Sequence, residues 1–161
     1  MIRPAEASDA EAIAAHWSAL IRDTAVTFNT IEKSPGDVAA LLLEKAEENL
    51  PFFVAIAEGE VMGFASYGQF RAGFGYANTM EHSIMLDRRA QGLGLGRALM
   101  AALEDHARGR DVHTLWAGVS GENPEGVRFH RHMGFTELAT LPEVGFKFGR
   151  WMDLVLLYKR L

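Results

Sequence analysis

Three alternating glycines form the segment whose chemical meaning is clearest. Residues 91–96 read Gln-Gly-Leu-Gly-Leu-Gly and lie between a strand-like stretch and an amphipathic helical one. Glycine lets a ligand approach the backbone closely, and the first turn of the following helix offers unpaired amides at the positive end of its dipole. This combination suits a phosphate or pyrophosphate. Arg88, Arg89 and Arg97 flank the segment and favour an anion over a turn without a ligand.

The two common phosphate-binding loops do not match this segment. A P-loop ends in Gly-Lys-Ser or Gly-Lys-Thr, and no such sequence is present. The dinucleotide motif Gly-x-Gly-x-x-Gly needs its third glycine at position 97 or 99, where the chain carries Arg97 and Leu99. A nucleotide-binding module is therefore the weakest interpretation of the turn.

The composition removes several other classes of protein. The chain has 161 residues and Cys 0, which excludes disulfide scaffolds, thiolate metal sites and cysteine nucleophiles. A net charge of −5 argues against a dedicated nucleic-acid binder. No apolar run approaches the roughly 20 residues of a membrane helix, and the N-terminal residues lack the order of a signal peptide. We expect one cytoplasmic domain spanning residues 1–161, with no nucleic-acid or membrane partner.

Helical and strand patterns alternate along the chain, which predicts a mixed α/β domain. The helices are expected to start at Ser8 or Asp9, at Ser34-Pro35, near residue 95 and near residue 123. Strands are predicted at 2–4, 52–57, 61–67, 79–86, 112–119, 135–141 and 151–159.

The glycine turn resembles an acyl-coenzyme A motif. Gln91–Gly96 matches the (Q/R)-x-x-G-x-(G/A) pattern of the GNAT superfamily of N-acetyltransferases. Asn123, His130 and Gly134-Phe135 are similar to that superfamily's second cofactor segment, where a Tyr often stands at the place of His130. The resemblance implies the GNAT fold, a mixed, mostly antiparallel sheet of about six to seven strands flanked by about four helices.

Three further segments resemble the phosphinothricin-type acetyltransferases within that superfamily. Residues 76–83 are similar to their Y-R-x-T-x-E-x-S stretch, residues 144–153 to V-G-x-K-x-G-R-W-x-D, and Thr27-Phe28 to the start of T-F-E. This resemblance implies acetylation of the amino group of phosphinothricin, methionine sulfoximine or methionine sulfone. Three residues depart from the pattern, with Ala77 in place of Arg, Gly126 in place of Ser and Asn29 in place of Glu.

The resemblance also implies which residues hold the cosubstrate acetyl-coenzyme A. Ser83, Ile84 and Met85 would pair with the pantetheine arm, with their amides near the thioester carbonyl. Asn123 would contact the coenzyme from the other side. No metal site is expected, because His130 and His132 lie two residues apart on a helix. The residues whose amides would hold the pyrophosphate are Gln91, Gly92, Leu93, Gly94, Leu95 and Gly96.

Glu81 and His130 are the candidate catalytic residues. Glu81 shares a strand face with residues 83 and 85, so its carboxylate can take a proton from a substrate ammonium, directly or through a water. The alternative is a strand glutamate that only faces solvent. His130 can act as a base, as the acid for the departing thiolate or only as a coenzyme contact, and these roles stay open. The histidines interpreted as structural are His16, His82, His106 and His113.

A second set of residues is expected to line the acceptor site. The resemblance indicates a wall formed by Arg71, Phe74, Tyr76 and Thr79, with contributions from Phe28, Lys147, Arg150 and Trp151. For the two aromatics Phe28 and Trp151 the alternative is core packing, and residues 145–149 can simply form a hairpin turn. Proteins of this subfamily are commonly dimers, so a homodimer is expected.

The sequence therefore predicts an acetyl-coenzyme A-dependent N-acetyltransferase acting on the primary amine of a small amino-acid-like acceptor. A chain without Cys cannot form an acetyl-cysteine, which favours direct transfer from thioester to amine. A protein N-terminus or a polyamine is the alternative acceptor. A non-catalytic acyl-coenzyme A-binding regulatory domain is the alternative from another class, and the presence of Glu81 and His130 argues against it.

Overall fold

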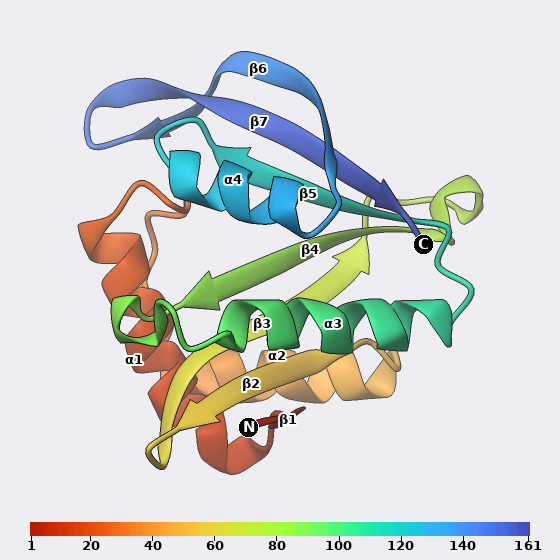
Figure 1. Ribbon diagram of the computed structural model, residues 1–161. Coiled ribbons are helices and arrows are strands. Elements are labelled where there is room, and N and C mark those ends of the chain that lie inside the picture. The colour runs from red at the N-terminus through yellow and green to blue at the C-terminus, as the bar shows by residue number, and fades with distance from the viewer.

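The strands of the chain form one seven-stranded sheet, in a computed structural model that describes all residues from 1 to 161 (Figure 1). They are β1 (Ile2–Pro4), β2 (Phe52–Ala57), β3 (Glu60–Gln69), β4 (Thr79–Leu86), β5 (Thr114–Ser120), β6 (Thr136–Lys147) and β7 (Arg150–Arg160). Their order across the sheet is β1-β2-β3-β4-β5-β7-β6. Only β4 and β5 run parallel to each other. The expected mixed, mostly antiparallel sheet is confirmed.

Helices cover both faces of this sheet (Figure 1). They are α1 (Ala10–Asp23), α2 (Pro35–Glu47), α3 (Leu95–Arg108) and α4 (Pro124–His132), with 3-10 turns η1 (Ala7–Asp9), η2 (Phe74–Tyr76) and η3 (Arg88–Ala90). The larger apolar core joins α3 and α4 to one face, and a smaller core joins α1 and α2 to the other. None of the helices has the length and hydropathy needed to cross a bilayer.

Two helix starts show how local chemistry sets the elements. Ser34 caps α2, since its Oγ accepts from the Asp37 amide while the Asp37 carboxylate accepts from the Ser34 amide. Asp9 stands at the predicted N-cap of α1, but its side chain does not bond to that helix. Its carboxylate instead accepts two hydrogen bonds from Arg3 at 2.7 and 2.8 Å. The predicted N-cap position of Asp9 is therefore confirmed, but the predicted hydrogen bond from the first turn of α1 to its side chain is wrong.

The C-terminal hairpin is longer than the sequence patterns predict. β6 continues to Lys147, and the turn consists only of Phe148 and Gly149, both with positive φ. Pro142 and Glu143 lie where the register between β6 and β7 shifts, which explains why the apolar alternation breaks near residue 141. Gly145 belongs to the extended strand, so the alternative of a hairpin turn over 145–149 holds only for Phe148 and Gly149.

Candidate active site

The parallel strands β4 and β5 separate from each other in the middle of the sheet. They pair only from Thr79 opposite Thr114 to His82 opposite Ala117. Beyond that point β4 remains paired with β3 as far as Leu86, and β5 with β7 as far as Ser120. We call this opening the β4–β5 fork, bounded by residues 83–86 and 118–120; Figure 1 shows the two strands diverging. The backbone groups of residues 83–86 that face β5 have no strand partner and are available to a ligand.

The glycine turn lies at the end of β4 and leads into α3. Gly92 and Gly94 have φ of 77° and 75°, in the left-handed region that favours glycine. Gly94 is the N-cap residue of α3, and no side chain caps that helix. Gly96 allows close packing, because a Cβ there would lie 2.8 Å from Leu86 Cδ1. The first-turn amides of α3 are therefore free to bind an anion.

The three arginines near this turn differ in their availability. Arg89 donates to Asp87 and to Glu60, so its guanidinium is occupied. Arg88 and Arg97 are exposed and form no salt bridge. Two of the three positive charges singled out in the sequence are thus free beside the turn, which keeps the site suited to phosphate groups.

Asn123 closes the other side of the fork at the start of α4. Its Oδ1 accepts from the Gly126 amide at 3.0 Å. A Cβ on Gly126 would lie 2.5 Å from Asn123 Nδ2, so the residue that departs from the subfamily pattern allows this close cap. The Nδ2 group of Asn123 remains the donor available to a ligand, and its contact with the coenzyme stays a prediction.

Glu81 lies on β4 just before the fork, directly opposite Gly68 of β3 and Trp116 of β5. Glu81 is exposed to solvent, yet partial desolvation of its carboxyl group raises the pKa, and the nearby positive charge of Arg71 counteracts this shift. On β5, Gly118 leaves space beside the carboxylate, since a Cβ there would lie 3.6 Å from Glu81 Oε1. A carboxylate with a raised pKa in an open, aromatic-lined site can act as a general base.

Aromatic rings line this face of the sheet beside Glu81. Phe70 stacks on Trp116 with ring centroids 5.2 Å apart, and Trp116 also packs against Tyr158 at 5.5 Å. The Arg71 guanidinium lies over the Phe70 ring at 5.3 Å. The Tyr76 ring lies tilted against Phe70, with centroids 6.5 Å apart. The residues predicted from the sequence do not include Phe70, Trp116 and Tyr158, although the two-residue period of 114–120 places Trp116 on one face with Gly118.

Phe28 and Lys147 meet at the loop between α1 and α2. The buried Lys147 Nζ donates to the carbonyl oxygens of Thr24 at 2.7 Å and Thr27 at 2.9 Å. The ring of Phe28 lies against Gly145, where a Cβ would approach it to 2.4 Å. Lys147 therefore holds the loop that carries Phe28, and its ammonium is engaged with backbone rather than directed at solvent.

Thr79 lies two residues before Glu81 on the same face of β4. The other predicted acceptor residues, Phe74, Arg150 and Trp151, belong to other elements. Arg150 pairs with Glu122, at 2.6 Å between Nη2 and Oε1, a contact that no sequence pattern predicts. Trp151 packs on Phe146 and is 60% exposed, so it does not belong to the core. Phe74 is fully exposed in η2. The structure thus gathers the acceptor residues into separate groups around Glu81, the 24–33 loop and the hairpin tip.

His130 lies on the opposite face of β4 from Glu81. Alternation along β4 directs His82 and Ile84 toward α3 and α4, and Glu81 toward the face that α1 and α2 cover in part. The imidazole of His130 is buried and contacts His82 through their Nε2 atoms at 3.1 Å. No three His, Asp or Glu side chains are arranged to hold a metal ion.

Comparison with known proteins identifies the family. The model of the acetyltransferase (GNAT) family matches residues 17–135, which contain the fork, the glycine turn and α4. The chain belongs to the GNAT family. It is therefore an acyltransferase of the N-acetyltransferase type, as its sequence motifs indicate.

Individual GNAT proteins resemble the chain over nearly its full length. An L-methionine sulfoximine/L-methionine sulfone acetyltransferase of Salmonella typhimurium is 35% identical over 99% of this chain and 94% of its own. A crystal structure of a ribosomal-protein-alanine N-acetyltransferase from Brucella melitensis has a TM-score of 0.96 and 37% identity, covering 100% and 99% of the two chains. A phosphinothricin acetyltransferase from Sinorhizobium meliloti, solved with acetyl-coenzyme A, has a TM-score of 0.94 and 28% identity, covering 100% and 88%.

The GNAT fold here carries the features that acetyl-coenzyme A requires. The free edge of β4 can pair with an extended arm that contains amides, and the uncapped start of α3 can bind phosphates. The left-handed Gly92 and Gly94 allow the backbone to turn around such a group. These observations support the cosubstrate expected from the sequence.

Proposed function

We propose that this GNAT enzyme transfers the acetyl group of acetyl-coenzyme A to the primary amine of a small amino-acid-like acceptor. The acceptor class is that of phosphinothricin, methionine sulfoximine and methionine sulfone. The carrying observation is the position of Glu81, two residues before the fork, with a carboxyl pKa raised by partial desolvation and an aromatic wall beside it. Arg71, within electrostatic reach of Glu81, supplies the positive charge that an acceptor carboxylate needs.

Different residues of the chain have different roles in the acetyl transfer. Acetyl-coenzyme A, when bound, supplies the activated acetyl thioester. Ser83, Ile84 and Met85 would hold its extended arm through backbone groups, and their amides would supply hydrogen-bond donors to the thioester carbonyl oxygen. Glu81 accepts a proton from the acceptor ammonium, so that a neutral amine attacks. No Cys is present, so no acetyl-cysteine can form, which favours direct transfer. The new amide C–N bond forms as the thioester C–S bond breaks, and coenzyme A leaves as its thiolate.

A peptide N-terminus is the second candidate acceptor. The Brucella neighbour is named for a protein acceptor, and the rim of this site is open, with Phe74 fully exposed and Tyr76 43% exposed. A small amino acid is favoured, because Ala77 and Asn29 change individual contacts but leave Arg71 beside Glu81.

A thiol-release screen decides among these acceptors. Coenzyme A thiol is measured with methionine sulfone, methionine sulfoximine, phosphinothricin, an alanine-started peptide and spermidine, and the thermal shift caused by acetyl-coenzyme A is the control for binding. We expect the highest kcat/KM with the sulfone, sulfoximine or phosphinothricin. A higher kcat/KM with the peptide or the polyamine would show that this compound represents the acceptor class and would contradict the small amino acid. A thermal shift without thiol release from any amine supports a regulatory binding domain and overturns the enzyme proposal.

We also propose a homodimeric, cytoplasmic enzyme formed by residues 1–161 as one N-acetyltransferase domain. Support for the dimer comes from the exposed aromatics Phe146, Phe148 and Trp151 on the β6–β7 hairpin, which form an apolar surface of the kind that partners cover. Light scattering of the purified protein tests the mass, and a monomer at micromolar concentration contradicts this part of the proposal. Cell fractionation tests the location.

A further inference from the structure

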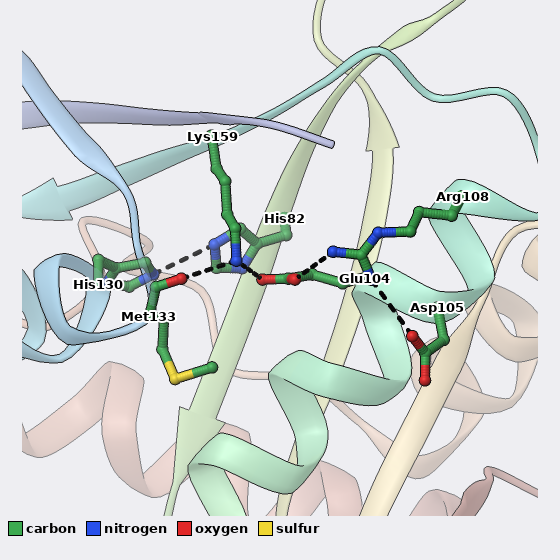
Figure 2. A network of polar contacts seen from close by, with 7 residues as sticks. All are labelled: His82, Glu104, Asp105, Arg108, His130, Met133 and Lys159. Atoms are coloured by element: carbon green, nitrogen blue, oxygen red, sulfur yellow. Dashed lines mark hydrogen bonds and ion pairs between the residues drawn. The ribbon is translucent and has the colours of Figure 1, made fainter.

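Two buried histidines meet at the point where β4 and β5 begin to diverge. His82 is the last β4 residue paired with β5, and His130 reaches it from α4 (Figure 2). The two residues are 5% and 4% exposed. Their rings lie 5.0 Å apart, and each packs against Phe135. Among the side-chain hydrogen bonds, this is the one that joins α4 to β4.

The hydrogen-bond partners determine which nitrogen carries the proton. His130 Nδ1 lies 2.7 Å from the Gly126 carbonyl oxygen. A carbonyl oxygen can only accept, so His130 carries its proton on Nδ1, and in the neutral ring Nε2 is a bare acceptor. His82 must then donate its Nε2–H to His130 Nε2 across 3.1 Å. His130 is thus the Nδ1–H tautomer and His82 the Nε2–H tautomer.

This arrangement leaves one nitrogen of the pair without a partner. His82 Nδ1 is buried and has no hydrogen bond. A buried acceptor without a partner lowers stability, and an apolar side chain at this position would avoid that loss. Burial also lowers the pKa of both rings, which keeps the pair neutral at neutral pH. The contact is therefore poorly explained as a device for stability alone.

The charged groups nearby are occupied with one another. Beyond the Phe135 ring, Lys159 Nζ donates to Glu104 at 2.6 Å and to the Met133 carbonyl at 2.8 Å (Figure 2). Arg108 donates to the other oxygen of Glu104. Because this network is satisfied internally, it supplies no carboxylate to the histidines, and His82 is the side-chain partner of His130.

We propose that His82 is a positioning residue of the acetyl transfer, holding His130 as the Nδ1–H tautomer and fixing α4 against β4 at the fork. This inference rests on the proposed function. In this state both N–H groups of the pair are already donated, so His130 can give a proton to a thiolate only after receiving one. The lone pair of His130 Nε2 likewise accepts from His82, so His130 can take a proton only when this hydrogen bond breaks. Of the roles left open by the sequence, coenzyme contact is therefore compatible with the resting geometry, and base or acid requires the pair to separate.

Nitrogen NMR of the histidine rings tests the tautomers without any turnover. The full chain is labelled with ¹⁵N-histidine, and long-range ¹H–¹⁵N spectra are recorded at pH 7.5 with and without acetyl-coenzyme A. Signals are assigned by His82→Gln and His130→Gln. We expect a protonated Nδ1 on His130 and a protonated Nε2 on His82. A protonated Nε2 on His130, or a protonated Nδ1 on His82, overturns the assignment.

Kinetics of two substitutions test the positioning role. We expect His82→Leu to lower kcat about tenfold at saturating substrates, because misplaced groups at a reacting centre lose rate steeply. His82→Gln should keep kcat within about threefold, because its carboxamide can donate to His130 Nε2. His113→Gln, at an exposed histidine, is the matched control. A folded His82→Leu enzyme with unchanged kcat, or a His82→Gln enzyme that loses at least tenfold, overturns the proposal.

The experiments distinguish a failure of the proposed enzyme function from a failure of the role assigned to His82. Wild-type protein that shifts in melting temperature with acetyl-coenzyme A but releases no thiol with any amine contradicts the enzyme proposal. Loss of the expected NMR pattern contradicts the His82 assignment alone. Where His82→Leu does not fold, His82→Gln decides, since it must retain both the Nδ1–H form of His130 and most of kcat.

Discussion

Mild acid is expected to destabilise the fold through the buried histidine pair. Burial lowers the pKa of His82 to about 3, from an ordinary value of 6.5. Between these two values the unfolded chain binds a proton that the folded chain refuses, so stability falls as the pH drops below 6.5. At pH 5 the loss from His82 is about 2 kcal/mol relative to pH 7.5, at roughly 1.4 kcal/mol per pH unit.

Other titratable groups also change the pH dependence of the free energy of unfolding, and their contributions can be distinguished from that of His82. The lowered pKa of buried His130 adds to the loss in the same pH range. The raised pKa of Glu81 acts in the opposite direction, since the folded state then holds a proton more readily than the unfolded state. Asp9 and Asp87 have lowered pKa values, so their contributions are lost only below about pH 4.

Urea unfolding of three proteins at pH 7.5 and pH 5 measures the His82 contribution. The wild type and the His113→Gln control should lose the same free energy of unfolding between the two pH values. His82→Leu should lose about 2 kcal/mol less, because it has no imidazole to protonate there. An equal pH-dependent loss in His82→Leu and wild type would show that His82 is not held neutral by burial, and the reasoning fails.

The remaining expectations concern binding of the two substrates. Lys147→Met removes both hydrogen bonds to the 24–27 backbone and should raise KM for the acceptor about tenfold while KM for acetyl-coenzyme A stays unchanged; equal increases contradict it. Gly94→Ala strains a residue at φ 75°, by about 1 kcal/mol, and should weaken acetyl-coenzyme A binding by isothermal titration several-fold; unchanged affinity argues against the turn as the phosphate site. Arg71→Gln removes the positive charge that opposes the pKa rise of Glu81, so the acidic limb of the pH profile of kcat/KM should move to higher pH. A shift to lower pH contradicts the electrostatic effect of Arg71 on Glu81.

Much of the fold can be predicted because its strands are dense apolar runs between clear turns. The patterns place strands at 52–57 and 79–86, and β2 and β4 occupy these residues. The capped start of α2 is predicted equally well, because Ser34-Pro35 is a local signal. The hairpin length is not predictable in this way, since the register shifts beside Pro142 break the alternation.

Site chemistry is harder to read from sequence when it depends on contacts between distant segments. Glu81 could be singled out from its place on a strand, but its neighbour Trp116 comes from pairing of β4 with β5. His82 gave no signal of its own, because its partner His130 lies 48 residues away. Lys147 was predicted to contact substrate, whereas in the structure its ammonium holds the carbonyls of Thr24 and Thr27. Its direct contact with an acceptor stays a prediction.

The most direct test of the central claim is turnover of Glu81→Gln with methionine sulfone, measured beside its affinity for acetyl-coenzyme A. The change removes the proton-accepting carboxylate and keeps the size of the side chain. We expect kcat to fall about a hundredfold or more, with the dissociation constant for acetyl-coenzyme A within about twofold of wild type. Unchanged kcat, or an equal loss of kcat and acetyl-coenzyme A affinity, would contradict the role of Glu81 as the base.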